Sequence, residues 1–188
     1  MNADALSDLV LLLGCAAAGW LGGPGRPAWR AAMGLLGVAA ACGVLRYSGV
    51  DEALGPHRFL SLLAASVAFL LMLASLRWPQ SPLALRPTAV GRFVVLVGGL
   101  GVAVSQMGAP WWAQVVPGVS ALAIAWTMLA RRSVLGGVGS AALLAGFAVA
   151  ALAGPEALLV GLFNKTQALH YLLAVAVLAL GGAGRRRS

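Results

Sequence analysis

Two histidines, a single lysine and five acidic side chains carry most of the chemistry that this chain could perform. Histidine nitrogens and carboxylate oxygens bind zinc, and a site with three protein ligands and one water would ionise that water near neutral pH. The sequence therefore makes His57, His170 and Asp51 the candidate metal ligands, with zinc as the candidate cofactor. Lys165 and Ser61 are the candidate catalytic groups, because each could polarise a bound substrate.

Further polar side chains are predicted to line the same pocket. Three of them share the last apolar segment with His170, and three stand at the ends of other segments: Asn164, Thr166, Gln167, Asp8, Gln106 and Gln114. Asp8 is the alternative carboxylate ligand. His57 and Ser61 are four residues apart, so they share one face of a helix. The simpler interpretation is that the histidines only make hydrogen bonds to Ser, Thr or Asn side chains of neighbouring helices.

The elements that must position these residues are membrane-spanning helices. The chain has 188 residues, of which 61% are hydrophobic and 10% charged, whereas soluble domains carry about 25% charged residues. A transmembrane helix needs about 20 apolar residues, and backbone groups in lipid must be paired within the segment. Cutting the sequence at polar and Pro/Gly clusters predicts seven spans, at about 5–23, 28–45, 59–76, 89–107, 111–130, 134–153 and 157–180. We therefore predict one all-α transmembrane domain over residues 1–188, a seven-helix bundle.

Basic residues are distributed unevenly over the connectors between these spans. Ten of the thirteen lysines and arginines fall on one side of the membrane if the spans alternate in direction: Arg26, Arg30, Arg77, Arg86, Arg92, Arg131, Arg132, Arg185, Arg186 and Arg187. Short cytoplasmic loops carry an excess of basic residues. This bias predicts an outside N-terminus and a cytoplasmic C-terminus. The acidic residues then all lie on the outer side: Asp4, Asp8, Asp51, Glu52 and Glu156.

Most hydrogen-bonding residues of the spans lie beneath the outer rim in this topology. The last segment contributes the polar run 163–170, in which Gln167 and His170 share one helix face. Lys165 lies well inside the membrane if the whole segment 157–180 spans, or near the outer headgroups if its first residues lie at the interface. In both cases the sequence predicts a polar pocket that opens outward.

Glycines cluster within several spans. Examples are Gly34 with Gly37, and Gly136 and Gly137 with Gly139. Small residues let helix backbones approach closely in lipid, so these positions are predicted to be helix contacts. The first apolar run lacks the basic flank of a signal peptide and is expected to remain as a span.

The octapeptide Phe163–His170 resembles a late motif of small bacterial seven-span proteins related to the ceramidase and progestin-receptor-like (CREST) membrane hydrolases. Phe163, Asn164 and His170 match that motif, while Lys165 stands where the bacterial branch has another histidine. His57 precedes Ser61, whereas the hydrolase motif has the serine first. The resemblance implies a zinc bound by histidines from an early helix and the last helix, and a bacterial inner (plasma) membrane location.

Two functions follow as hypotheses. The first is a metal-assisted hydrolase of lipid or amide substrates that enter from the membrane. The second is a non-enzymatic small-solute transporter, or a ligand-binding or accessory membrane protein, in which Lys165 and Arg58 recognise an anion. The scattered arginines do not form the basic stripe of a nucleic-acid-binding protein. The expected partners are the lipid bilayer and a lipid or small-molecule ligand, and the sequence leaves a homo-oligomer open.

Overall fold

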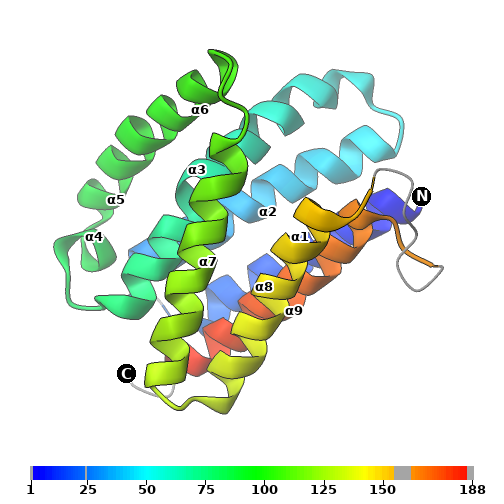
Figure 1. Ribbon diagram of the computed structural model, residues 1–188. Helices are drawn as coiled ribbons and strands as arrows, with labels where there is room; N and C mark the ends of the chain where they lie inside the picture. Colours follow the sequence, from blue (N-terminus) through cyan, green and yellow to red (C-terminus); the bar gives the residue numbers. More distant parts are fainter. Residues whose placement is uncertain (1, 24, 155–161, 186–188) are drawn as a thin grey trace.

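The computed structural model describes residues 2–23, 25–154 and 162–185, and throughout these ranges the regular elements are helices (Figure 1). Seven helical segments in this part of the chain are long and apolar enough to cross a membrane. The predicted all-helical, seven-span architecture is therefore confirmed at the level of helix type, length and apolar character.

The ends of the helices lie within about five residues of the predicted spans, with one exception. Their bounds are α1 (Ala3–Leu21), α2 (Pro27–Tyr47), α3 (Leu54–Arg77), α4 (Pro82–Leu85), α5 (Pro87–Phe93), α6 (Gly99–Gln106), α7 (Trp112–Ala130), α8 (Val134–Leu152) and α9 (Lys165–Arg185). A short 3-10 turn, η1 (Asp51–Ala53), precedes α3, and a π-helical turn, η2 (Val94–Gly98), joins α5 to α6. The exception is α9, which begins at Lys165 instead of near 157; residues 155–161, which include Glu156, lie outside the described ranges.

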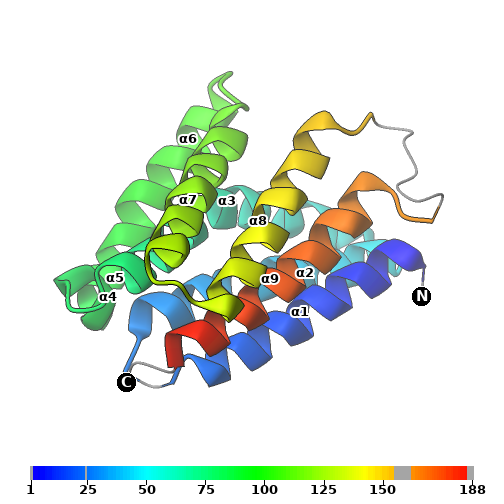
Figure 2. The same cartoon turned by 60° about the horizontal axis from the view of Figure 1, so that its bottom comes forward.

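Most of the long helices form a closed ring. Contacts run from α1 to α2, α3, α7, α8 and α9 in turn, and α9 packs back against α1. Figure 2 shows the first and last helices lying side by side along most of their length. Residues from opposite ends of the sequence therefore meet inside one bundle.

The fourth span packs on the outside of this ring. It consists of α5, η2 and α6, and it contacts mainly α3 (Figure 1). Val95 and Leu96 are 71% and 70% exposed, as expected for side chains that face lipid. The sequence predicted one uninterrupted helix here, whereas a π-helical turn breaks it. Gly98, at the end of that turn, lies so close to α3 that a Cβ would meet Leu63 and Val67.

Local sequence signals explain where several helices begin. The side chain of Asn2 accepts a hydrogen bond from the backbone N–H of Ala5 at 2.9 Å and so caps α1. Pro27 occupies the first turn of α2, where its missing N–H costs nothing. Ser133 caps α8 by accepting from the backbone N–H of Gly136 at 3.1 Å.

The interior is packed with aliphatic side chains and glycines. Leu71, Ile124 and Val177 from three different helices are fully buried. A Cβ at Gly139 would lie 3.1 Å from both the Ala176 carbonyl oxygen and the Leu180 nitrogen of α9. The predicted role of glycine clusters in close helix packing is thus confirmed at Gly139, where α8 and α9 approach each other through their backbones. It is wrong at Gly34 and Gly137, where an added Cβ would meet no atom within 4 Å.

Candidate functional site

A small cavity lies at the centre of the helix ring. Its volume is about 190 Å³, and every helix of the ring contributes to its wall. Four of the lining side chains can exchange hydrogen bonds or protons: Asp8, His57, Ser61 and His170. We call this space the histidine cavity. The two histidines, from α3 and α9, are therefore brought together as the sequence predicted for a shared pocket.

His170 is held by two polar residues of α1. Its Nδ1 lies 3.1 Å from Ser7 Oγ and 3.3 Å from Asp8 Oδ1. Ser7 uses its hydroxyl hydrogen to donate to the Asp4 carbonyl oxygen at 2.8 Å, so its oxygen can only accept from His170. These partners assign the hydrogen of the neutral imidazole to Nδ1. Nε2 of His170 is then the nitrogen with a free lone pair.

His57 has the opposite tautomer. Arg46 Nη1 lies 3.1 Å from His57 Nδ1, and a guanidinium can only donate hydrogen bonds. Nδ1 of His57 is therefore the acceptor, which leaves the hydrogen on Nε2. Tyr47 supports this arrangement, because its ring packs edge-on against His57 and lies 4.8 Å from the Arg46 guanidinium carbon. Each of these two lining residues thus keeps one ring nitrogen outside the described contacts, a donor on His57 and an acceptor on His170.

Asp8 is buried between three helices. Its side chain is 2% exposed, and its Oδ2 atom is buried without a hydrogen-bond partner in the described part of the chain. Gly43 of α2 makes room for it, since a Cβ at that position would overlap the Asp8 carboxyl group. Asp8 itself lines the histidine cavity, so its carboxyl group is a further polar group at the edge of that cavity.

Asp4 ties the beginning of α1 to the beginning of α9. Its Oδ1 accepts hydrogen bonds from Asn164 Nδ2 at 2.9 Å and from Gln167 Nε2 at 2.7 Å. Asn164 also caps α9, because its Oδ1 accepts from the Gln167 backbone N–H at 2.9 Å. These contacts explain why the last helix begins at Lys165. They position His170 in the second turn of the helix.

Pro117 adds a backbone feature to the cavity wall. Proline has no N–H, so the carbonyl oxygen of Ala113 does not receive the usual helical hydrogen bond from the residue four positions later. Both Ala113 and Pro117 line the histidine cavity. One residue of the cavity wall therefore has a carbonyl group without its usual helical partner.

The other residues predicted for the site lie away from this cavity. None of the following is among its lining residues: Asp51, Gln106, Gln114, Asn164, Lys165, Thr166 and Gln167. Asp51, Gln106 and Gln114 are exposed at the ends of their helices. Lys165 and Thr166 belong to the first turn of α9, between Asn164 and Gln167, the two residues that contact Asp4. Of the predicted site, the structure gathers Asp8, His57, Ser61 and His170.

The sequence did not predict the contacts that hold the histidines. Ser7, Arg46 and Tyr47 contact His170 or His57, but each is an ordinary residue near the end of an apolar segment. Ser7 and Asp8 are so far from His170 in the sequence that no helical periodicity relates them. Only the pairing of α1 with α9 in space reveals their role.

The predicted zinc site does not fit this arrangement well. In the described ranges no three His, Cys, Asp or Glu side chains are grouped closely enough to hold a metal ion. The Nε2 hydrogen of His57 must be lost or moved before that nitrogen could bind a cation, and the Arg46 guanidinium beside it opposes a second positive charge.

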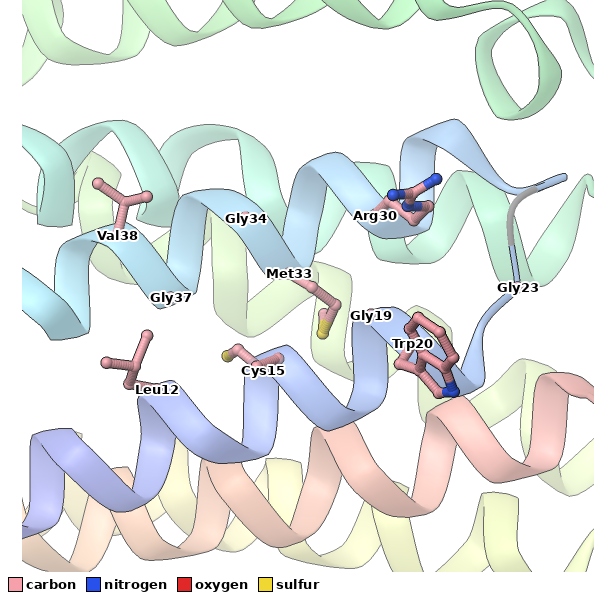
Figure 3. Close-up of a pocket in the computed structure, with 11 residues that line it drawn as sticks. Leu12, Cys15, Gly19, Trp20, Gly23, Arg30, Met33, Gly34, Gly37 and Val38 are labelled. Atoms are coloured by element: carbon pink, nitrogen blue, oxygen red, sulfur yellow. The ribbon is translucent and has the colours of Figure 1, made fainter.

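A larger hollow lies elsewhere, between α1 and α2. Figure 3 shows this groove, of about 630 Å³, with Leu12, Cys15 and Met33 beside small residues such as Gly34 and Gly37. Trp20 and Arg30 lie toward one end. Its wall is mostly apolar, and apart from Arg30 and the Cys15 thiol its lining residues have no ionisable side chain. The histidine cavity is smaller, but it is the one of the two that is lined by histidine, carboxyl and hydroxyl groups.

No family model, curated protein or solved structure matches this chain. The case for a function therefore comes from the geometry of the histidine cavity alone.

Proposed function

We propose that this protein binds a small neutral solute in the histidine cavity, as a transporter or ligand-binding protein of the membrane. The observation that carries the proposal is the pair of contacts at the two Nδ1 atoms, from Arg46 to His57 and from Ser7 to His170, which imply opposite tautomers. His57 Nε2–H can donate to a ligand oxygen, while His170 Nε2 can accept from a ligand O–H or N–H. A small amide or alcohol carries both of these groups.

The size of the cavity supports a small ligand. Its volume of about 190 Å³ is below the roughly 300–1,000 Å³ of pockets that bind larger organic molecules. Polar groups inside a membrane bundle are costly and usually mark a solute or ion pathway. The Asp8 carboxyl and the Ala113 carbonyl add acceptors for a ligand with more than one hydrogen to donate.

A metal-assisted hydrolase is the second candidate. It is favoured by the presence of Ser61, both histidines and the Asp8 carboxyl around one cavity. In that case His170 would bind zinc through Nε2, with Asp8 orienting its ring through Nδ1, an arrangement common to histidine ligands. His57 would have to change its tautomer to bind the same zinc ion.

Ligand-detected NMR on the purified protein tests the solute hypothesis. Acetamide and propane-1,2-diol, which donate and accept, are expected to bind, whereas acetate, which only accepts at neutral pH, is expected to bind at least about tenfold more weakly. The His57→Leu variant removes the donor and should weaken acetamide binding about tenfold. Thr166→Val, a change in α9 away from the cavity, is the matched control and should leave binding unchanged.

Metal analysis of the same samples separates the two candidates. Failure of both acetamide and propane-1,2-diol to bind would contradict the solute hypothesis. Stoichiometric zinc in the native protein that disappears in His170→Ala would support the hydrolase instead. The fold of each variant is checked by circular dichroism, because His170→Ala also leaves Asp8 without its partner.

We also propose that the N-terminus lies outside and the C-terminus in the cytoplasm of a bacterial inner membrane. The bias of arginines toward one set of connectors supports this orientation. A periplasmic alkaline phosphatase reporter fused after Ser188 is expected to be inactive, and the same reporter placed in the connector after Tyr47 should be active. The reverse pattern would overturn the orientation and place the histidine cavity nearer the inner face.

A further inference from the structure

Two apolar grooves lie on either side of α2. The first is the groove between α1 and α2, and the second lies between α2 and the fourth span, with walls from α3, α5 and η2. Each has a volume of about 630 Å³. We call them the α1–α2 groove and the α2–α5 groove. Gly34 and Val38 line both, so the two grooves meet along one face of α2.

That face of α2 carries a charged side chain at one end. Arg30, Gly34 and Val38 follow one another at intervals of four residues, so they lie in a row along the helix (Figure 3). Arg30 and Gly34 are exposed, and Val38 is 52% exposed. Arg30 also lines the α1–α2 groove, with Trp20 at the same end (Figure 3). None of the described residues that line the α2–α5 groove is ionisable.

The length of the grooves matches one leaflet of a membrane. Along α2 the α2–α5 groove extends from Pro27 to Val38, which is about 17 Å at 1.5 Å per residue. Half of a hydrocarbon core of about 30 Å is about 15 Å. An exposed tryptophan and an arginine at the end of a span are typical of the headgroup level. The grooves therefore run from the headgroups, near Trp20 and Arg30, to the middle of the bilayer.

This arrangement fits a phospholipid with two acyl chains and one anionic headgroup. One chain fits along each groove, and the phosphate then lies at Arg30. A guanidinium has five N–H donors and binds phosphate through two of them at once, so Arg30 can hold the headgroup beside any other contact that it makes. Gly34 has no side chain, and a Cβ there would meet no atom within 4 Å. The two chains therefore have room to meet over Gly34, below the glycerol.

A second copy of the chain fits the same face less well. Copies inserted in one membrane share their orientation, and a symmetric pair uses the same surface patch on both partners. Pairing through the row Arg30, Gly34 and Val38 would bring the two Arg30 side chains together. Like charges repel, whereas an anionic headgroup attracts Arg30. The charge at the end of the grooves thus favours a lipid over a dimer.

We propose that one anionic diacyl phospholipid binds astride α2. Its chains occupy the α1–α2 groove and the α2–α5 groove, and its phosphate contacts Arg30. The site is on the outside of the helix ring, so it is separate from the histidine cavity and does not depend on the solute proposed there.

The test counts bound lipid by native mass spectrometry on the full-length protein in a non-ionic maltoside detergent. The probes are palmitoyl-oleoyl phosphatidylglycerol, phosphatidylcholine with the same chains, and palmitoyl lysophosphatidylglycerol, which has only one chain. One phosphatidylglycerol is expected per protein, bound about fivefold more tightly than phosphatidylcholine. Loss of one chain is expected to weaken binding at least about fivefold, because contacts along one groove are lost.

Two pairs of variants test the headgroup contact and the grooves separately. R30Q is expected to weaken phosphatidylglycerol binding about fivefold, to the level of phosphatidylcholine. Its matched control is R77Q, which removes the same charge from an exposed arginine at the end of α3, outside both grooves. Gly34→Leu fills the place where the grooves meet and is expected to weaken both diacyl lipids. Gly137→Leu, at a glycine of α8 that is equally open, should leave binding unchanged.

Several results would overturn the proposal. Equal binding of phosphatidylglycerol and phosphatidylcholine, or an equal loss in R77Q and R30Q, would remove the role of Arg30. Equal binding of the one-chain lipid, or full binding by Gly34→Leu, would remove the role of the paired grooves. A lipid-free dimer that Gly34→Leu separates would assign this face to a second copy of the chain. R30Q alters an exposed side chain, so the headgroup contact remains testable even if Gly34→Leu does not fold.

Discussion

Replacing Trp29 with alanine is expected to destabilise the folded bundle by about 3–5 kcal/mol. The Trp29 ring is completely buried between α1, α2 and α9. Its Nε1 donates to the Ala18 carbonyl oxygen at 2.8 Å, and the Arg26 guanidinium carbon lies 5.3 Å from the ring centre. The change would leave a large cavity, remove one of the two hydrogen bonds that the Ala18 carbonyl oxygen accepts, and loosen Arg26. The free energy of unfolding is measured by titrating the protein in maltoside micelles with sodium dodecyl sulfate.

Trp20→Ala provides the matched control for this experiment. The Trp20 side chain, near the end of α1, is 87% exposed, so its loss removes little internal packing. We expect it to change the unfolding free energy by at most about 0.5 kcal/mol. Equal destabilisation by the two substitutions would show that the contacts of Trp29 do not hold these helices together.

Gly139→Leu is expected to have the second largest effect, a destabilisation of about 3 kcal/mol. The first atom of the new side chain would lie 2.7 Å from Leu180 Cγ and 3.1 Å from the Ala176 carbonyl oxygen. Because one of these obstacles is backbone, it cannot move aside by rotating a side chain. Helices α8 and α9 would have to separate, which would also shift His170. The same titration measures the loss.

Gly137→Leu makes the same change two positions away in the same helix. A Cβ at Gly137 meets no atom within 4 Å, so the larger residue should be accommodated. Both substitutions also replace glycine by a better helix former, so that contribution cancels in the comparison. If Gly139→Leu were as stable as Gly137→Leu, the close approach of α8 and α9 would be disproved.

The helices could be predicted because lipid imposes simple requirements on the sequence. Long apolar runs and Pro/Gly breakers were enough to locate most of the spans within a few residues. The start of α9 was misplaced, because apolar residues before Phe163 resemble a span while the cap made by Asn164 and Gln167 is a local polar signal. The π-helical turn at Val94–Gly98 was also not predicted, because such a turn has no characteristic amino-acid composition.

The candidate site could be predicted only in part from the sequence. His57 and His170 stood out because they are rare and polar within apolar runs, and they line the same cavity. The contacts that set their tautomers come from Ser7 and Arg46, and these contacts cannot be predicted without knowing which side chains are neighbours in space. Asp51 was chosen for its charge, although it is exposed in a turn and does not line the cavity.

The pairing of the first helix with the last has a consequence for biosynthesis. Ser7 and His170 are 163 positions apart in the chain, and a ribosome adds about 5–20 residues per second. His170 therefore leaves the ribosome roughly 10–30 s after Ser7 and Asp8, the residues that hold its imidazole. During that interval the nascent chain carries the Asp8 carboxyl group without its histidine, and the cavity is completed only when the final hairpin has been delivered to the translocon.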